Sequence, residues 1–479
     1  MTDNATFGGL PEPLSAEALE IVGTGAQRIL DTLGVRIDSP EALSLLADLG
    51  VRCDHRSGRA FPSGSDVARA LDTVTRGYTL HERRPGGRVL PVDSRHTYTV
   101  SGGAALRMFA DGQYATATWD DLIDTTVLHQ ALDQVDVLID VVEPPELEQG
   151  TLYPVVAAVL LSYSTKPLLL QAGRREDLRK IVRMMTLVAG SEAALRARPL
   201  FMTGTNAEPP LQIGKEGAEV LIDAARAGVP VSLGDYMVLG STGPMHFLAA
   251  QAQRTATVLT GLVLTQAAAP GSIYDFSCHS GACDLRTGDT VTMSPDVLRM
   301  CAASVQVGRH YGLVTHSLAC TEARGPDAQA VAERSMALVA AFLSGATFVH
   351  HATCCMAGME LADHAQSVLD NELIGRARGL TQSTEAEGFE EALAALGEVV
   401  TDPLYAGLGF LGHPHTAARC RRSSPGETLF EAGQLARWLT GERTGIAERA
   451  ERVAQEVLRE KQACVPNDLQ EELFAIARE

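Results

Sequence analysis

The sequence lacks an excess of basic residues. Its 479 residues include 40 Lys and Arg against 59 Asp and Glu, which gives a formal net charge of −19 at pH 7. A protein that binds nucleic acid needs a basic surface to neutralise phosphates, so we expect no nucleic-acid partner. The acidic balance suits a cationic substrate, although an acidic surface that keeps the protein soluble is the simpler explanation.

The sequence also lacks an apolar run long enough to cross a membrane. Its longest apolar segments, 155–161 and 258–269, are shorter than the roughly 20 residues that a membrane-spanning helix needs. Residues 1–9 have neither the basic nor the apolar part of a signal peptide. These absences predict a soluble protein of the cytoplasm that has no membrane partner.

Cysteine is scarce in the first half of the chain and concentrated later. Of the nine cysteines, Cys53 alone precedes residue 278, and six lie between Cys278 and Cys355. In a long cytoplasmic chain such cysteines indicate thiols or ligands rather than a disulfide framework. No C-x-x-C spacing is present, so the commonest signature of a zinc site is missing.

Short apolar strands alternate with helical segments from about residue 136 onward. The predicted strands are 137–142, 167–170, 199–203, 229–233, 271–275, 312–315, 346–349 and 405–411. Eight such units predict a (β/α)8 TIM barrel. A doubly wound sheet is the alternative, but no glycine-rich phosphate motif follows the first strand.

The rest of the chain surrounds this barrel. Residues 1–100 have the pattern of an N-terminal mixed α/β subdomain, with helices at 16–33, 39–49 and 65–74 and a hairpin at 51–60. Residues 101–424 would contain the barrel, and residues 425–479 would form a C-terminal helical cap with helices at 431–439 and 444–461. The C-terminal helices resemble an arm between subunits, so we expect a homo-oligomer.

Polar and aromatic side chains gather at the ends of the predicted strands, whereas the strand interiors are apolar. In a barrel the active site lies at the C-terminal ends of the strands. The residues at these ends are Gln171, Thr203–Asn206, Asp235, Tyr236, Asp275–His279, His316–Cys320, His350–Cys355 and His413. This asymmetry predicts an enzyme, with His316, Glu322 and His351 as the candidate catalytic residues.

One of these strand ends carries an unusual group of side chains. The strand 346–349 is followed by His350 and His351 and then by Cys354 and Cys355. Titratable imidazoles and soft sulfur ligands rarely follow a buried strand for packing alone. Consecutive strand residues point to opposite faces, so at most one of the two histidines faces the lumen if the strand continues.

A series of motifs, in order and over nearly the whole chain, resembles the trimethylamine methyltransferase family. Near the centre these are Gly234–Met237, Ser241–Pro244, Gly261–Gln266, Ala269–Gly271, Arg286–Gly288, Ser294–Asp296, Pro326–Gln329, Glu333, Ser344–Ala346 and Val368–Glu372. Toward the two ends they are Ile29–Val35, Ala117–Leu122, Thr165–Pro167, Gly412–Thr416 and Trp438–Gly441.

The resemblance implies a barrel enzyme that moves a methyl group from a methylated amine to the Co(I) of a separate corrinoid protein. The founding members contain pyrrolysine, and this sequence has none. It is therefore similar to the larger branch without pyrrolysine, in which quaternary amines such as glycine betaine are the known type of substrate. A quaternary ammonium needs no activation, so positioning its methyl group supplies most of the catalysis.

The chain departs from the family pattern at two places. Thr257 stands where relatives commonly have Glu in the long helix after Ser241–Pro244. The two histidines and two cysteines at 350–355 stand where glycine-rich or apolar sequence is expected. Both departures bear on the substrate rather than on the fold.

Aromatic faces hold a quaternary ammonium, at about 1–2 kcal/mol each when desolvated, together with a carboxylate. The candidates are Tyr236, Tyr274 and Phe276 with Asp235 or Asp275, and His350 beside them. For each ring, packing within the barrel is an equally good explanation. Arg324 is the candidate clamp for a betaine carboxylate, with a surface ion pair as the alternative.

Two other functions fit the same barrel. A zinc-thiolate methyltransferase is the second hypothesis, because barrel enzymes of that kind resemble this chain in having adjacent cysteines at one strand end and a third cysteine from another. Cys278, Cys354 and Cys355 would then hold a zinc ion that deprotonates a bound thiol. Buried cysteines are also common apolar fillers. The third hypothesis is a protein without catalytic activity that binds a betaine-like solute.

Overall fold

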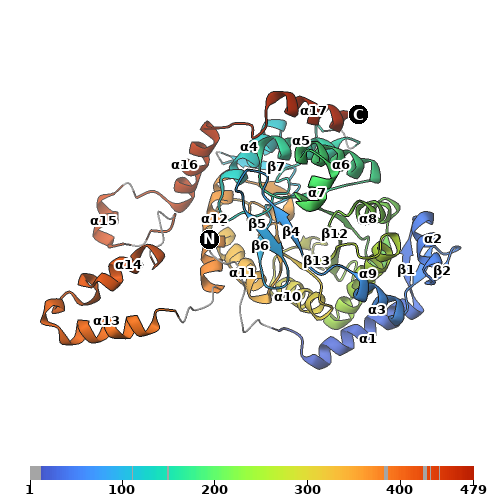
Figure 1. Ribbon diagram of the computed structural model, residues 1–479, viewed down its shortest axis with the longest axis horizontal. Helices are drawn as coiled ribbons and strands as arrows, with labels where there is room; N and C mark the ends of the chain where they lie inside the picture. The colour runs from blue at the N-terminus through green and yellow to red at the C-terminus, as the bar shows by residue number, and fades with distance from the viewer. Residues whose placement is uncertain are drawn as a thin grey trace.

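Eight parallel strands form a barrel at the centre of the protein (Figure 1). The structure is a computed structural model that describes residues 12–479 except 111, 148–149, 382–386, 424–428, 432 and 442. The barrel strands are β6 (Tyr98–Thr99), β9 (Leu168–Gln171), β10 (Phe201–Asn206), β12 (Val231–Leu239), β13 (Tyr274–Cys283), β15 (Thr315–Leu318), β16 (Phe348–His350) and a short extended segment at 137–142.

The barrel closes through that short segment. Val137 pairs with Val100 after β6, and Leu138 pairs with Leu168 of β9, both in parallel register. The order around the barrel is therefore β6, β16, β15, β13, β12, β10, β9 and the segment 137–142. The predicted TIM barrel is confirmed.

One predicted barrel strand is wrong. Residues 405–411 are not extended: they lie in and between two 3-10 turns, η2 (Pro403–Tyr405) and η3 (Gly409–Gly412), outside the barrel. Left-handed backbone at Gly407 (φ 85°) and Gly409 (φ 55°) interrupts any strand there. The missing strand is β6, which is too short to show a sequence period and lies in the last residues of the expected N-terminal subdomain.

Helices alternate with the strands and cover the barrel. They are α4 (Trp119–Ala131), α5 (Leu152–Tyr163), α6 (Arg175–Ala189), α8 (Lys215–Ala227), α9 (Phe247–Ala268), α10 (Pro295–His310), α11 (Ala328–Ser344) and α12 (His364–Thr381), with the short α7 (Glu192–Ala197) after α6. Their starts are capped as the sequence dictates: Ser294 accepts a hydrogen bond from Val297 N at α10, and Asp327 accepts one from Ala330 N at α11.

The N-terminal residues cover α9. Helices α1 (Ala16–Thr32) and α3 (Gly64–Thr73) pack on its outer side, with α2 (Pro40–Asp48) nearby. Consequently α9 is buried on nearly all of its faces, which explains its largely apolar sequence. Strand β1 (Val35–Ile37) pairs with β3 (Arg59–Phe61), which pairs with β2 (Arg52–Asp54), so the predicted hairpin is confirmed; β1 also pairs with β11 (Gln212–Ile213) from the barrel.

A hairpin closes the N-terminal end of the barrel. Its strands are β4 (Tyr78–His81) and β5 (Val89–Val92). Leu80 and Leu90 from this hairpin join a core cluster with Leu169, Met202 and Phe348 from the barrel strands. Because side chains alternate along a strand, this cluster identifies the residues of each strand that point into the lumen.

The C-terminal residues extend beyond the barrel. Helices α13 (Phe389–Thr401), α14 (Pro414–Ser423) and α15 (Leu435–Thr440) project from it, whereas α16 (Ile446–Arg459) packs on α12 and α17 (Asn467–Arg478) packs on α5 (Figure 1). A small sheet of β7 (Arg107–Ala110), β8 (Gln113–Thr116) and β17 (Leu361–Ala362) lies beside the barrel strands, and β14 (Thr290–Val291) pairs with β13. No helix in the described ranges has the length and apolarity to span a membrane.

Candidate active site

A chain of hydrogen-bonded side chains crosses the barrel lumen. His316 Nδ1 lies 2.7 Å from His350 Nε2, and His316 Nε2 lies 3.3 Å from Asp275 Oδ2. These residues come from β15, β16 and β13, and each is almost completely buried. Because a carboxylate accepts hydrogen bonds, the Nε2 proton of His316 points to Asp275, and in neutral His316 the Nδ1 atom then accepts from His350.

The hairpin at the bottom of the barrel contributes the next member of this chain. The Tyr78 hydroxyl of β4 donates to Asp275 Oδ2 at 2.7 Å. The Asp275 Oδ2 atom therefore takes two hydrogen bonds, while Oδ1 is buried with no partner. The site thus holds its carboxylate in one orientation and leaves one oxygen available to a ligand.

Two more histidines lie against this group. The ring of His279 is centred 4.9 Å from that of His350, and the rings of His350 and His351 are 6.0 Å apart. Burial, reinforced by the neighbouring histidines, holds the pKa values of His279 and His350 well below their ordinary value. Both imidazoles are therefore neutral at pH 7 and do not repel a cationic ligand.

Four buried polar atoms of this region have no hydrogen-bond partner. They are Asp275 Oδ1, His279 Nε2, His351 Nδ1 and the Tyr236 hydroxyl oxygen. A buried polar atom without a partner costs free energy, so native proteins satisfy such atoms with water or a ligand. His279, His351 and Tyr236 lie in the upper part of the lumen, whereas Asp275 is the second residue of β13 and lies lower, next to the hairpin of β4 and β5. Together these atoms mark a candidate site for a small polar molecule within the lumen.

The opposite side of the lumen is lined by small residues. Met202 and Asp275 point into the lumen, whereas Leu233 packs in the outer core. Because side chains alternate along a strand, the inward positions of β10, β12 and β13 include Gly204, Ser232, Gly234 and Ser277. Barrel interiors are normally filled by branched apolar side chains. These strands therefore contribute little side-chain volume beside the histidines, which favours a ligand site there.

The loop after β16 has an unusual backbone. His351 (φ 52°), Cys354 (φ 62°), Ala357 (φ 47°), Gly358 (φ 67°) and Met359 (φ 77°) all lie in the left-handed region. Left-handed residues other than glycine carry strain and persist when the surrounding structure fixes them, often at functional sites. The strain turns the loop so that His351 and Cys355 both face the group of histidines and Cys320.

Two thiols meet at this loop. Cys355 Sγ lies 3.6 Å from Cys320 Sγ, which follows β15. Burial raises the pKa of the Cys355 thiol, but the hydrogen bond from Cys320 and the charge of His351 outweigh burial and hold that pKa well below its ordinary value. The pKa of Cys320 is raised well above its ordinary value, chiefly by burial. Cys355 is therefore the more acidic thiol of the pair.

A pair of carboxyl groups adds negative charge near the mouth of the barrel. Burial raises the pKa of Asp140, at the end of the segment 137–142, well above its usual range, and its side chain is hydrogen-bonded to Glu143. Burial also raises the pKa of Glu143, and the hydrogen bond between the two side chains lowers it, so Glu143 is the more acidic carboxyl of the pair. A β-carbon on Gly103 would lie 3.6 Å from the Asp140 carbonyl and 3.0 Å from the ring of His351, so the pair is close to the histidines.

Several predicted substrate-binding residues lie outside the lumen. Tyr274 points toward the helices and donates to the Val258 carbonyl of α9 at 2.7 Å, and Phe276 packs in the same outer core. Their predicted contact with the substrate is wrong because side chains alternate along β13 and Asp275 takes the inward position. Asp235 of β12 also points outward, where burial raises its pKa and Arg254 of α9 opposes that effect.

The predicted Glu322 and His413 are held by contacts outside the group of histidines, and the predicted Arg324 is exposed. Glu322 accepts hydrogen bonds from Thr292 N at 2.5 Å and from Thr292 Oγ1 at 2.6 Å, so it fastens the loop after β14. Arg324 is exposed on the loop after β15. His413 lies beside η3 with its Nε2 atom 3.0 Å from Glu398 Oε2, outside any strand end.

The three predicted zinc ligands do not come together. Cys278 points outward from β13 into the main core. Cys354 bonds to Asp363 through both the N–H and the carbonyl of that residue, each at 3.0 Å, whereas Cys355 contacts Cys320. The left-handed Cys354 separates the directions of the adjacent thiols. Within the described part of the chain, no three His, Cys, Asp or Glu side chains are arranged to hold a metal ion.

Two members of the site escaped the sequence interpretation. Tyr78 belongs to a segment that shows no catalytic pattern, and its contact with Asp275 joins positions 197 residues apart. Cys320 was among the strand-end residues, but its pairing with Cys355 depends on the neighbouring ends of β15 and β16. In the sequence, only the expected order of the strands in a barrel indicates that these two cysteines are neighbours.

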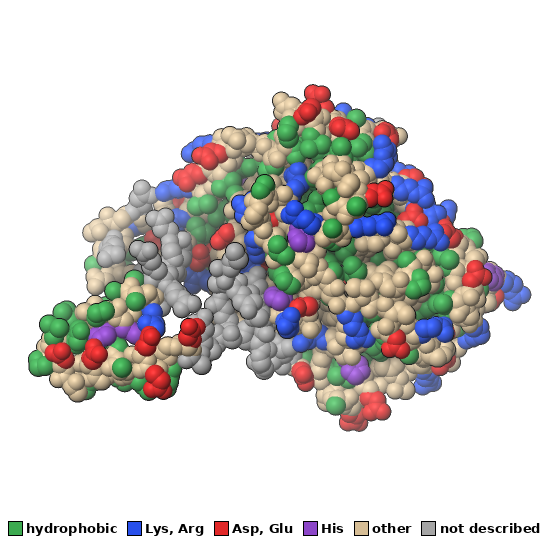
Figure 2. All heavy atoms as spheres, in the orientation of Figure 1, with side chains coloured by type: hydrophobic (Ala, Val, Ile, Leu, Met, Phe, Trp, Pro, Cys, Tyr) green, Lys and Arg blue, Asp and Glu red, His purple; other side chains and the backbone are tan. Residues whose placement is uncertain are grey.

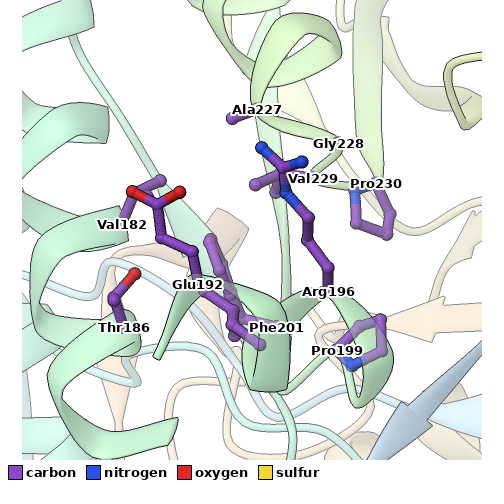
Figure 3. A pocket seen from close by; sticks show the side chains of 11 residues that line it. Val182, Thr186, Glu192, Arg196, Pro199, Phe201, Ala227, Gly228, Val229 and Pro230 are labelled. Carbon is purple, nitrogen blue, oxygen red and sulfur yellow. The ribbon is translucent and has the colours of Figure 1, made fainter. Parts of the chain in front are cut away.

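A separate pocket of about 250 Å3 opens at the opposite end of the barrel (Figure 3). Pro199 and Pro230, which precede β10 and β12, border it together with Glu192 and Arg196 of α7. The pocket therefore lies at the N-terminal ends of the strands, where the catalytic residues of a barrel enzyme are not expected. The thiols and most of the unpartnered polar atoms lie toward the other end, which we regard as the active site.

The fold is that of a (β/α)8-barrel enzyme, and its buried unpartnered polar atoms lie in the barrel lumen. The chain belongs to the trimethylamine methyltransferase family, whose sequence profile matches residues 8–478. It is therefore a methyltransferase of a family that acts on methylated amines.

Characterised relatives act on several amines. A trimethylamine methyltransferase (MttB) of Desulfitobacterium hafniense is 25% identical over 466 residues, which cover 97% of this chain and 92% of the relative. A glycine betaine methyltransferase from the same species is 23% identical, covering 93% of this chain and 92% of the relative. A proline betaine:corrinoid methyltransferase of Eubacterium limosum is 26% identical, covering 75% of this chain and 76% of the relative.

A solved structure shares the fold. The Methanosarcina barkeri monomethylamine methyltransferase (MtmB) matches 95% of this chain and 91% of its own chain with a TM-score of 0.51 at 12% sequence identity. This likeness supports the barrel architecture together with its extensions.

Proposed function

We propose that the protein transfers a methyl group from a quaternary amine of the betaine type to the Co(I) of a corrinoid carried by a separate protein. The observation that carries this proposal is the carboxylate of Asp275, buried in the lumen with one oxygen unpartnered, in a family member that contains no pyrrolysine. A buried carboxylate next to neutral histidines suits a permanent cation, which needs charge compensation but no proton.

The site offers separate groups for the two ends of a betaine. Asp275 Oδ1 would face the ammonium, and the Tyr236 hydroxyl would donate to the carboxylate of the substrate. His279 and His351 each have a further unpartnered nitrogen that satisfies the same carboxylate when it is protonated. The negative charge of the Asp140 and Glu143 pair attracts the cation toward the mouth of the barrel.

The residues of this chain position the methyl group and exclude water. The Co(I) of the bound partner supplies a nucleophile that attacks the methyl carbon in line with the C–N bond. Tyr78, Asp275 and His316 form a rigid floor, so the substrate meets groups that do not reorganise during the reaction. The product leaves with an uncharged tertiary nitrogen and its carboxylate unchanged, so no proton has to be delivered to it.

The C-terminal face of the barrel has a surface that suits the partner. Met245 and Leu285, on the loops after β12 and β13, are 65% and 71% exposed. A β-carbon on Gly240 would touch both side chains, so they form one apolar patch beside the mouth of the site. Exposed apolar patches of this kind mark sites of association with other proteins.

Methyl transfer to free Co(I) cobalamin tests the proposal. The purified protein is mixed with Co(I) cobalamin and single quaternary amines, including glycine betaine, and the loss of Co(I) absorbance is followed. We expect turnover with at least one betaine and none with trimethylamine. Transfer from trimethylamine alone, or no transfer from any quaternary amine, would contradict the proposed substrate class.

A further inference from the structure

Cys320 and Cys355 come from neighbouring strand ends and touch each other. Their sulfur atoms are 3.6 Å apart, and the residues are 1% and 2% exposed. The Thr321 N–H donates to the Cys355 carbonyl at 3.2 Å, so the two segments run side by side. Hydrogen-bonded neighbouring chains lie roughly 5 Å apart, which falls within the range of Cα–Cα separations found in disulfides.

The surroundings of the pair differ from those of an inert buried cysteine. Val297, Cys301 and Leu318 pack on one side of the pair. The side chain of His351 is hydrogen-bonded to Cys355, and the hydroxyl of Tyr236 lies within electrostatic range of both thiols. Positive charge from Arg334 also reaches Cys355. A thiol beside an imidazole and a guanidinium reacts as a thiolate, and a second thiol in contact can resolve the product.

We propose that Cys320 and Cys355 are a redox-active dithiol, which a hydroperoxide converts into a disulfide that reversibly closes the amine site. Methyl transfer as proposed above uses neither sulfur atom. The two functions are therefore independent, and each can fail without the other.

One molecule of hydroperoxide oxidises the pair of thiols in one protein molecule. The Cys355 thiol loses its proton and attacks the peroxide as a thiolate, the O–O bond breaks, and Cys355 becomes a sulfenic acid while the leaving hydroxide takes that proton to form water. The Cys320 sulfur then attacks the sulfenic sulfur, the S–O bond breaks, and the released hydroxide takes the Cys320 proton to form water. With hydrogen peroxide the sum is two thiols and one peroxide giving one disulfide and two waters.

The disulfide would change the site because its bond is short. Drawing the sulfur atoms together from 3.6 Å to about 2.0 Å moves the loop after β16 toward the end of β15. His351 lies four residues before Cys355 on that loop, and the hydroxyl of Tyr236 lies within electrostatic range of the pair. Displacements of this size exceed the roughly 0.5 Å within which a binding site must hold its groups.

The first test is a mass measurement on the full-length reduced protein. One equivalent of hydrogen peroxide should lower the intact mass by about 2 Da, the mass of two hydrogens, and should remove two thiols from alkylation by iodoacetamide. A peptide map without reduction should show Cys320 linked to Cys355, and dithiothreitol should restore both thiols. A stable sulfinic acid at Cys355 with no cross-link, or a cross-link between other cysteines, would overturn the proposal.

Variants test whether the disulfide requires Cys320 rather than another thiol of the same cluster. In Cys320→Ser, peroxide should give a sulfenic acid at Cys355 that dimedone traps, with no intramolecular link. In the control Cys301→Ser, which removes a thiol of the same cluster, the link should form as in the wild type. If the unfolding midpoint of Cys320→Ser differs from that of the wild type, Cys320→Ala replaces it in this test. A link that persists in either Cys320 variant contradicts the assignment.

The effect on the site is measured with the same samples. The oxidised protein should lose methyl transfer and regain it after reduction. Cys320→Ser cannot form the disulfide, so it should show no loss that comes from a disulfide and that dithiothreitol reverses. If no amine supports methyl transfer but the disulfide forms, the proposed function fails and the dithiol stands. If methyl transfer is unaffected by a fully formed disulfide, the dithiol does not close the site.

Discussion

Arg334 of α11 and Asp370 of α12 form an ion pair in which both side chains are fully buried. Arg334 Nε lies 3.1 Å from Asp370 Oδ1. The same guanidinium donates to the carbonyls of Ala319, His351 and Cys355, and Asp370 Oδ2 accepts from Cys354 N at 2.8 Å. Two outer helices therefore fix the strand-end loops that carry His351 and both thiols.

Removing one partner of this ion pair should destabilise the fold. In Asp370→Ala the Arg334 guanidinium loses its counter-charge at a site with no solvent, and Cys354 N loses its acceptor. We expect the free energy of unfolding to fall by about 3–5 kcal/mol, as measured by urea denaturation. A change below about 1 kcal/mol would show that water reaches the guanidinium.

The same helix offers a matched control. Glu372 pairs with Arg376 at 2.8 Å, but the Arg376 side chain is 46% exposed. An exposed pair within one helix contributes about 0.3–0.5 kcal/mol. Glu372→Ala should therefore leave the urea midpoint almost unchanged, so a large effect of Asp370→Ala cannot come from a loss of helical propensity in α12.

The barrel could be predicted because its signal is local. An apolar strand followed by a helix, repeated along the chain, is visible in any short window, and seven predicted strands correspond to barrel strands. The eighth, β6, has two residues and shows no period. The helices at 16–33, 39–49 and 65–74 were predicted to within a residue or two because their caps, Ser15, Ser39 and Ser63, are adjacent in sequence to what they cap.

The site could be predicted in part, for the same reason. His350 ends β16 as predicted, but Asp275 and His316 are the second residues of β13 and β15, and the three side chains meet because these neighbouring strands face the same lumen. The partners that fix them come from elsewhere: Tyr78 is 197 residues from Asp275, and Arg334 is 36 residues from Asp370. The direction of each β13 side chain depends on the strand register, which decides that Asp275 rather than Tyr274 faces the lumen.

A buried histidine gives the fold a defined pH dependence. His129 of α4 has its Nδ1 atom 2.7 Å from the Thr125 carbonyl and its Nε2 atom 2.9 Å from Thr353 Oγ1. Burial lowers the pKa of His129 to about 3, and the hydrogen bond to Thr125 only partly opposes this. Below pH 6.5 the unfolded chain binds a proton that the folded protein does not, so stability falls as the pH falls.

Replacing His129 should remove that dependence. Between pH 7 and pH 5 the free energy of unfolding of the wild type should fall by about 2 kcal/mol more than that of His129→Gln. Urea denaturation at several pH values gives the slope of the free energy of unfolding against pH for each protein. The two slopes can be compared even if the variant is less stable than the wild type at neutral pH. The exposed His55 provides the control, since His55→Gln should keep the wild-type slope. Parallel curves for His129→Gln and the wild type would contradict this account.

The projecting C-terminal helices expose an apolar face. Phe389, Leu393, Leu396 and Val400 recur on one side of α13 and are 45–74% exposed, and Leu404 and Leu411 continue the face at 72% and 87%. Figure 2 shows hydrophobic side chains gathered on this part of the surface. A stable interface buries about 800 Å2 on each subunit, and an apolar face that runs the length of a projecting helix is the kind of surface that such an interface covers.

We therefore expect a second copy of the chain to cover this face. Light scattering after size-exclusion chromatography should give a homo-oligomer, and the double variant Leu393→Glu, Val400→Glu should shift it to the monomer mass. Leu285→Glu, an equally exposed leucine on the barrel, is the control and should keep the wild-type mass. A wild-type monomer at micromolar concentration would exclude this role for the face.

Asp275 should determine the recognition of the cationic substrate. Asp275→Asn keeps the shape of the side chain and an acceptor for Tyr78, but removes the charge that faces the ammonium. The loss of one charge-assisted contact of about 2 kcal/mol corresponds to a fall of roughly 30-fold in kcat/KM for a quaternary amine. Tyr78→Phe, which removes one hydrogen bond from the carboxylate, should have a smaller effect in the same direction.

Asp235 distinguishes substrate recognition from a general need for buried charge. It lies on the neighbouring strand, is as fully buried as Asp275, and points toward Arg254 rather than into the lumen. Asp235→Asn should change the free energy of unfolding while kcat/KM stays within about threefold of the wild type. Equal losses of kcat/KM in the two variants would mean that Asp275 supports the barrel and does not face the amine.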